Sequence, residues 1–217
     1  IYGKDAGVAL VSGGDGNVFL GEDAGKAVSS GDENVCIGYQ AGDAFDAESD
    51  NIFIGSAAGG GASLAIGETI AIGSDTLLAL TDGVNNIAIG HGALKEHITG
   101  ARNIAIGHGA MDETGGSNAA ASNYNVALGW NALGGDWANV ESNNNIAIGA
   151  TAMDAVLNGA LRNTAIGHGA FSTLTEADDS VAIGYNAGLS ITTGEANICI
   201  GSGSLDVVDI AHYNISI

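Results

Sequence analysis

The chain has 217 residues, of which 36 are glycine and none is proline, and aromatic residues make up only 5%. A conventional globular core would lack its large side chains, while a hydrophobic content of 46% argues against disorder. The formal charge of −20 argues against nucleic-acid and membrane-surface partners, and no apolar run approaches the ~20 residues of a membrane-spanning helix.

One short unit recurs along almost the whole chain: Asn, a β-branched residue, a small residue, Ile or Leu, Gly, two variable residues and Ala. Most successive units are 17 residues apart, as between the first two glycines of the series. The pattern predicts a single repetitive β-solenoid over residues 1–217 with coils of about 17 residues. The glycines that mark the units are Gly21, Gly38, Gly55, Gly73, Gly90, Gly107, Gly129, Gly149, Gly167, Gly184 and Gly201.

The residues before each glycine alternate with period two, which is typical of a β-strand. In the unit that ends at Gly90, Ile87 and Ile89 point to one face and Ala88 points to the other. We expect the Ile and Val face to line the solenoid interior, and the small Ala face to lie outside. Burial of the Ala face around a three-fold axis would produce a homotrimer, either intertwined or side by side.

Two positions of the unit have structural roles. The Asn at the start of each strand is expected to stack into an amide ladder along the fibre. The Gly after each strand permits a positive φ at the corner, where a Cβ would be strained. The clearest examples of these positions are Asn86, Gly90, Asn103, Gly107, Asn145, Gly149, Asn163 and Gly167.

The second half of the unit carries weaker apolar positions. One falls four or five residues after the glycine, as at Leu94 and Met111, and another falls seven or eight after it, as at Phe45 and Val208. Seventeen residues suffice for two short strands and two turns. The spacing therefore predicts a flattened two-layer roll rather than a three-sided hexapeptide helix.

The motif Asn-Ile-Ala-Ile-Gly-x-x-Ala resembles the head repeats of YadA-type trimeric autotransporter adhesins. Asn163 to Phe171 is also similar to the repeat arrays of bacteriophage tail-fibre proteins. The resemblance covers residues 17–204 and implies a trimeric, left-handed β-roll that acts in surface attachment. The period of about 17 is longer than the adhesin head repeat, and no stalk, membrane anchor or C-terminal chaperone is recognisable.

The repeat is interrupted by two longer spacings, from Gly107 to Gly129 and from Gly129 to Gly149. Trp130, Trp137 and Tyr124 lie in this part of a chain that is otherwise poor in aromatic residues. They are our candidates for contacting a glycan or protein receptor, with the packing of both Trp side chains as the alternative. A further irregularity is a pair of Ile-Gly motifs that end at Gly67 and Gly73 and cannot both begin full coils.

Three histidines occupy the position after the corner glycine, namely His91, His108 and His168. Copies that converged in a trimer would offer metal ligands, but a solvent-facing corner is the simpler interpretation. Cys36 and Cys199 occupy the small-residue position and are expected to be buried and unpaired. We expect no cofactor, with weak surface Ca²⁺ binding at acidic turns left open.

These observations favour a non-enzymatic, homotrimeric fibre segment for surface attachment, located on a virion as part of a tail fibre or in the extracellular space as a cell-surface adhesin head. The alternatives are a purely structural extracellular filament and, further off, a solenoid polysaccharide depolymerase. The expected partners are copies of the chain itself and a cell-surface receptor. The sequence suggests neither nucleic-acid binding nor membrane insertion.

Overall fold

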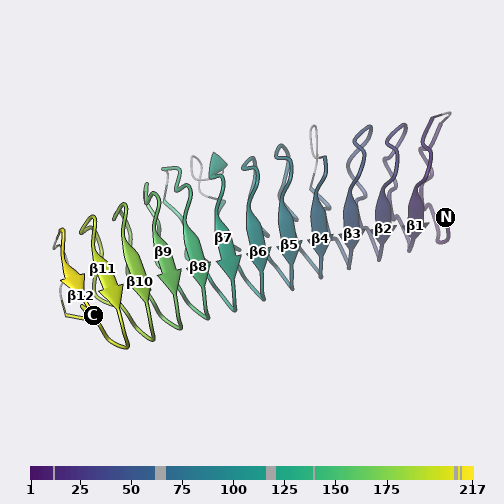
Figure 1. Ribbon diagram of the computed structural model, residues 1–217. Coiled ribbons are helices and arrows are strands. Elements are labelled where there is room, and N and C mark those ends of the chain that lie inside the picture. Colours follow the sequence, from purple (N-terminus) through teal and green to yellow (C-terminus); the bar gives the residue numbers. More distant parts are fainter. Residues whose placement is uncertain (12, 62–66, 116–120, 139, 208–209, 211) are drawn as a thin grey trace.

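The computed structural model describes residues 1–217 except 12, 62–66, 116–120, 139, 208–209 and 211. Its strands form one 12-stranded sheet in which every strand pairs in parallel with its neighbours in sequence (Figure 1). No α-helix occurs in the described ranges. The strands are β1 (Val18–Leu20), β2 (Val35–Ile37), β3 (Ile52–Ile54), β4 (Ile70–Ile72), β5 (Ile87–Ile89), β6 (Ile104–Ile106), β7 (Val126–Leu128), β8 (Ile146–Ile148), β9 (Thr164–Ile166), β10 (Val181–Ile183), β11 (Ile198–Ile200) and β12 (Ile215–Ser216).

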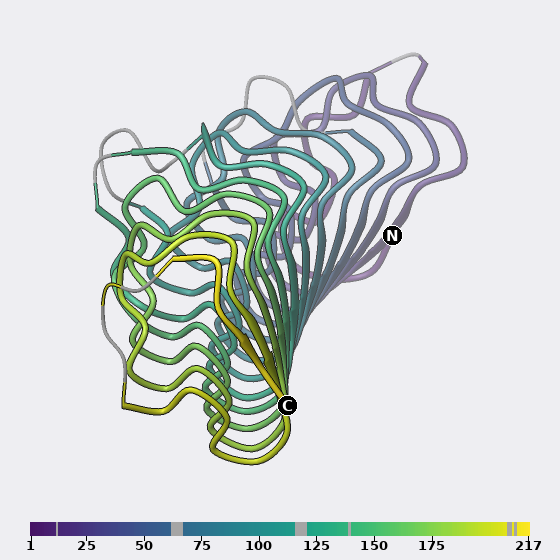
Figure 2. The same ribbon diagram turned by 60° about the vertical axis from the view of Figure 1, so that its left-hand side comes forward.

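The strands stack in strict register, which confirms an all-β parallel solenoid with coils of about 17 residues. Val18 pairs with Val35, and the register persists across the longer coils, where Ile104 pairs with Val126 and Val126 with Ile146. The longer spacings therefore leave the pairing of the strands unchanged. Figure 2 shows the coils as stacked loops that rotate gradually along the chain.

The prediction for the two faces of the strand is wrong. The central residue of each full strand is buried, and the flanking Ile or Val side chains are half-buried or exposed, as in the pattern of β5. Ala88 and Ala105 are 0% exposed, whereas Ile106 is 39% exposed. Alternation assigns residues to two faces without saying which is inside, and the narrow coil has room for a small side chain at the strand centre.

Larger core side chains come from the turns. Leu94 and Met111, four residues after their corner glycines, are fully buried, and so is Phe45 at the seventh position. The Ala that ends each motif also points inward, as at Ala93. Most of the predicted apolar positions of the second half are thus confirmed as core positions, but Ile98, Leu189 and Leu205 are half-buried and Val208 lies outside the described residues.

The second half of the coil is built from turns rather than from the predicted second strand. In the coil that begins at Gly90, Ala93 N donates to Gly90 O (3.4 Å) and Lys95 N donates to Gly92 O (3.3 Å). The intervening amide of Leu94 donates to Ala110 O of the next coil (3.0 Å). Positive φ at Gly92 (65°) and Leu94 (51°) suits the third position of type II turns. Successive tight turns therefore bring the apolar residues of this half into the core without a second strand.

The asparagine ladder is confirmed. Asn103 N and Nδ2 donate to Asn86 Oδ1 (2.9 and 3.3 Å), and Asn125 N donates in turn to Asn103 Oδ1 (2.9 Å). The same contacts link Asn163 to Asn145. These side chains are fully buried, so each unpaired amide would be costly. The ladder fixes the register of one coil on the next.

A second set of coil-to-coil hydrogen bonds, which the sequence analysis missed, lies two residues before the ladder position in several coils and has the opposite direction. Asp32 Oδ1 accepts from Asp15 N of the preceding coil (2.7 Å), and Asp178 Oδ1 accepts from Leu161 N in the same way (2.7 Å). Asn123 Oδ1 likewise accepts from Ala101 N (2.7 Å). Asp and Asn at this position are therefore part of the coil-to-coil bonding.

The corner glycines behave as predicted. Gly107 has a φ of 144°, and a Cβ built on it would lie 2.2 Å from Gly129 O of the next coil. Backbone from the next coil therefore excludes a side chain at this point. Gly73 is the corner that follows β4 and marks the coil there. The competing motif at residues 63–66 lies outside the described residues.

Candidate functional site

The outer face of the sheet is an apolar stripe that is interrupted by one polar residue, Thr164 of β9. It consists of the first and third residues of each strand, for example Ile104 and Ile106 of β6 and Ile146 and Ile148 of β8. Ile106, Ile148 and Ile183 are 39%, 36% and 39% exposed. At ~4.8 Å per coil the stripe is roughly 50 Å long. A contiguous apolar surface of this length is typical of a protein–protein contact.

A second surface feature is a column of ring side chains at the position after the corner glycine. Its members protrude strongly, with exposures of 52% for Tyr39, 57% for Trp130 and 58% for Tyr185. His91 stacks on His108 with ring centroids 5.0 Å apart, and His168 stacks on Tyr185 at 5.5 Å. The rings occur at Tyr39, His91, His108, Trp130, His168 and Tyr185. We call this set the ring column.

The three candidate metal-binding histidines thus belong to one column, but their neighbours are mainly other rings. His91 Nε2 lies 3.8 Å from Asp75 Oδ2, and His91 and His108 stack on each other. His168 lies beyond them along the column, next to Tyr185. Among the described residues, no group of three or more His, Cys, Asp or Glu side chains is arranged to hold a metal ion.

The three aromatic receptor candidates are not brought together. Trp137 is only 1% exposed and its Nε1 donates to Leu133 O (3.2 Å), so as a surface contact it is a wrong prediction. Its indole fills a core position that Leu or Phe occupies in other coils. Tyr124 is 52% exposed but precedes β7, where the Arg102 guanidinium lies 5.6 Å from its ring centroid. Trp130 follows β7, at the opposite end of that strand.

The coils next to the insertions hold a buried polar cluster that the sequence analysis missed. His97 occupies a turn position that is apolar in most coils, and it is fully buried. Asn103 Nδ2 donates to His97 Nε2 (3.2 Å), so the Nδ1 proton of His97 is left to donate to Thr114 Oγ1 (3.0 Å). Burial lowers the pKa of His97 to about 4, and the side chain is neutral at physiological pH. The sequence did contain a signal for the burial of His97, namely its position seven residues after Gly90, where most coils carry an apolar residue.

Both cysteines are buried and unpaired, as predicted. Burial raises the pKa of the Cys36 thiol to about 12 and that of Cys199 to about 11, which makes both poor nucleophiles.

Turn carboxylates also have local roles. Glu48 Oε2 accepts from the backbone N of Asp46 (3.0 Å) and of Ala47 (3.1 Å). Ordinary turn hydrogen bonding therefore accounts for this acidic segment.

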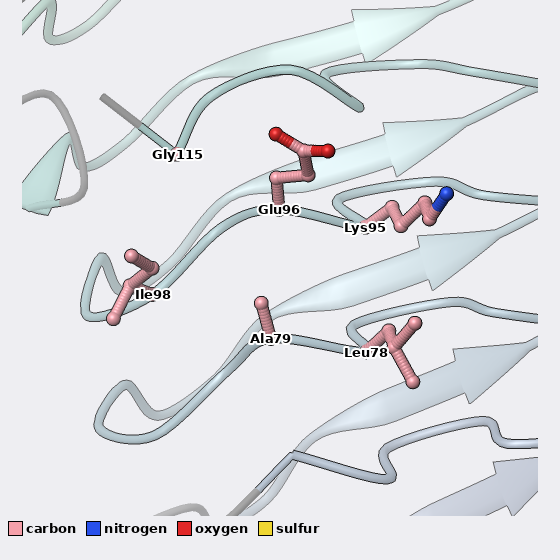
Figure 3. Close-up of a pocket in the computed structure, with 6 residues that line it drawn as sticks. All are labelled: Leu78, Ala79, Lys95, Glu96, Ile98 and Gly115. Atoms are coloured by element: carbon pink, nitrogen blue, oxygen red, sulfur yellow. The ribbon is translucent and has the colours of Figure 1, made fainter.

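A depression of about 370 Å³ lies on the turn side of the coils that carry β4 to β6 (Figure 3). Figure 3 shows Leu78 and Lys95 at one end and Ile98 at the other, with Ala79 and Glu96 between them. This lining combines one amine and one carboxylate with apolar groups. It contains no nucleophile and base pair that would support catalysis.

No protein-family model, curated protein or solved structure matches this chain in the comparisons made with each. In the part of the chain that the structure describes, no helix is long and apolar enough to cross a membrane. Function therefore has to be argued from the two surface features, the apolar stripe and the ring column.

Proposed function

We propose that this chain is a segment of a non-enzymatic, homotrimeric fibre that attaches to surfaces, as in a viral tail fibre or a cell-surface adhesin head. The observation that carries the proposal is the apolar stripe along the outer face of the sheet. Isolated exposed hydrophobics are normal on soluble proteins, but a long row of Ile, Val and Leu that only Thr164 interrupts needs a partner.

A closed three-fold assembly suits this stripe better than an open array. The stripe is long and narrow, and three such surfaces that meet along one axis bury all of them without leaving an edge for further growth. The assembly surface is then the Ile and Val face rather than the Ala face. The resemblance of the repeat to adhesin heads and tail fibres supports the trimer and a left-handed roll.

The solution mass of the protein tests the assembly. We expect light scattering after size exclusion to give three times the chain mass of 21.3 kDa. Ile106→Asp should dissociate the trimer, since it would bury three carboxylates near one axis. Val156→Asp is the matched control, because Val156 is 48% exposed but lies in a turn, away from the stripe. A monomeric parent, or equal effects of both variants, contradicts the trimer.

Attachment itself is tested with labelled protein on a panel of intact bacterial strains. We expect stable adherence to a subset of strains and none to the others, because receptor recognition is selective. Adherence should fall sharply for Ile106→Asp, since a trimer engages a surface through three copies at once. Failure to adhere to any strain contradicts attachment while leaving the trimer to be judged by mass.

A further inference from the structure

The ring column has a vacant place in the middle of the molecule. Trp130, Ala150 and His168 follow the corner glycines of three successive coils, whose strands β7, β8 and β9 pair in register. Backbone bonds confirm the alignment at this level, because Thr151 N donates to Trp130 O (2.9 Å) and Gly169 N to Ala150 O (3.0 Å). A methyl group therefore stands where the neighbouring coils carry rings.

The size of the vacancy follows from the column itself. Rings on adjacent coils lie 5.0 Å apart at His91 and His108, and 5.5 Å apart at His168 and Tyr185. Two coil spacings separate the backbone positions of Trp130 and His168, which is about 9.6 Å for coils ~4.8 Å apart. One further ring placed midway would lie within the range of 4.5–7 Å at which ring pairs interact favourably.

The walls of the vacancy are exposed, and polar groups lie beside it. Trp130 is 57% exposed, His168 is exposed and Ala150 is half-buried. Burial raises the pKa of Asp154, in the same coil as Ala150, and the Asn131 side chain and His168 are close enough to its carboxylate to lower that pKa in opposition. A ring that enters between Trp130 and His168 would therefore find two exposed ring side chains on its flanks and a carboxylate beside it.

We infer that this vacancy, defined by Trp130, Ala150, His168 and Asp154, is a binding site for a pyranose ring of a neutral glycan. The apolar face of a pyranose stacks on the indole, and its hydroxyls donate to the Asp154 carboxylate. The chain charge of −20 disfavours anionic sugars. An aromatic side chain would stack equally well but would leave the carboxylate edge unused. This inference rests on the proposed attachment function and assigns it a ligand class.

The site is tested in the intact protein through its two tryptophans. Trp137 is buried and serves as an internal reference, whereas acrylamide should quench Trp130 efficiently. The probes are maltotriose, mannotriose, galactotriose and triacetylchitotriose. At least one of them is expected to protect Trp130 from acrylamide, with saturable binding by calorimetry. Protection by none of them overturns the site, as does poor quenching of Trp130 in the absence of sugar.

Ala150→His fills the vacant place with the residue that the column carries at His108 and His168, so the coil should tolerate it. Affinity for the protecting sugar is expected to fall at least tenfold. Ser56→His places the same ring on a coil far from the site and should leave affinity unchanged. Trp130→Ala, followed by calorimetry, should also lose at least tenfold. Unchanged affinity in Ala150→His or Trp130→Ala overturns the proposal.

The outcome separates this inference from the trimer. The site is formed by consecutive coils of one chain, so Ile106→Asp should still bind the sugar if it folds as a monomer. A parent that is monomeric yet binds sugar removes the trimer and keeps the site. Protection of Trp130 by N-acetyltyrosinamide and by no sugar overturns the glycan assignment in favour of an aromatic peptide ligand.

Discussion

The N-terminal coils and the central coils have the same backbone but fill the core from opposite sides. In β1 to β3 the strand centre carries Phe19, Cys36 or Phe53, and the fourth residue after the corner is glycine. In β4 to β9 every strand centre is Ala, and the fourth residue after the corner is Leu, Met or Phe. The large side chain thus comes from the strand in the coils of Phe19 and Phe53 and from the turn in the central coils, whereas the coil of Cys36 has a small residue at both positions.

Steric contacts explain why the two solutions exclude each other. A Cβ on Gly59 would lie 2.6 Å from the Phe53 ring, and one on Gly25 would lie 2.5 Å from Phe19. In the central coils, Leu94 adopts the same left-handed conformation as these glycines, with a φ of 51°. Burial of its side chain offsets the strain of a positive φ in a non-glycine residue. The coil therefore has room for one large group, supplied by either position.

The largest expected effect comes from exchanging the two solutions in one coil. Phe53→Ala should destabilise the protein by about 3–5 kcal/mol through the cavity that it leaves. Gly59→Leu alone should cost about 1–3 kcal/mol through overpacking. The double variant reproduces the central arrangement, so it should be more stable than the sum of the two costs predicts, by up to ~3 kcal/mol. Urea unfolding at one fixed protein concentration measures this coupling.

The reverse exchange in a central coil, Ala88→Phe with Leu94→Gly, is the matched control. It should show coupling of the same sign, because Ala88 and Leu94 hold the equivalent positions and both are fully buried. Strictly additive costs in both coils would contradict the view that strand centre and turn share one core position.

The same comparison shows how much of the fold the sequence predicts. Coil length, the parallel strands, the Asn ladder and the corner glycines follow from residue types at fixed spacing, because each has a local reason at its own position. The orientation of the strand did not follow, since Ile87 and Ala88 are both apolar and alternation is symmetrical. A comparison of the coils in the sequence shows that a large residue at the strand centre, such as Phe53, occurs together with Gly at the fourth position after the corner, such as Gly59. This pairing would have identified the inward face.

The candidate site was predictable in part. The shared position of Trp130 and His168 was visible from the motif, but neither ring stacking nor the vacancy at Ala150 could be derived without the coil register. Trp137 lies only seven residues after Trp130 and yet is buried, because the insertion displaces it to a core position of the turn. Residue type alone could not separate these two indoles.

The next largest effect concerns pH and distinguishes the central coils, which hold His97, from the N-terminal coils, which carry Val28 and Phe45 at the same turn position. The pKa of His97 is about 4 in the folded state against an ordinary value of 6.5. The unfolded chain therefore binds a proton more readily, and stability is lost as the pH falls from 6.5 towards 4. The loss attributable to His97 is about 3 kcal/mol.

His97→Leu should remove this component. The difference in unfolding free energy between parent and variant, measured by urea unfolding from pH 7 to pH 4, isolates it from the carboxylates common to both proteins. The parent should lose stability relative to the variant across this range. A difference that does not change with pH would show that His97 is not neutral and buried as described.

A smaller effect is expected at the junction of the two regions, where Thr69 replaces the ladder Asn before β4. The backbone N of Thr69 donates to Asn51 Oδ1 (3.1 Å), as the Asn residues of the ladder do. Its hydroxyl, however, donates to Gly67 O (3.1 Å) rather than to a side chain of the ladder. Thr69→Asn restores the amide found in most coils and should stabilise the protein by about 1 kcal/mol. Thermal unfolding measures the gain, and Asn145→Thr, which introduces a similar break in the ladder away from His97, should show a change of opposite sign.

The smallest expected effect concerns the labelling of the two cysteine thiols, which should not react in the native protein. Cys36 belongs to an N-terminal coil and Cys199 to a coil near the other end, and both are fully buried with raised pKa values. A thiol reagent at pH 8 should label neither in the native protein and both in urea. Because labelling requires local opening, single-cysteine variants Cys36→Ala and Cys199→Ala compare the stability of the two ends directly. Rapid native labelling of either thiol would mean that its coil opens independently of the rest, and the solenoid would then not be one cooperative stack.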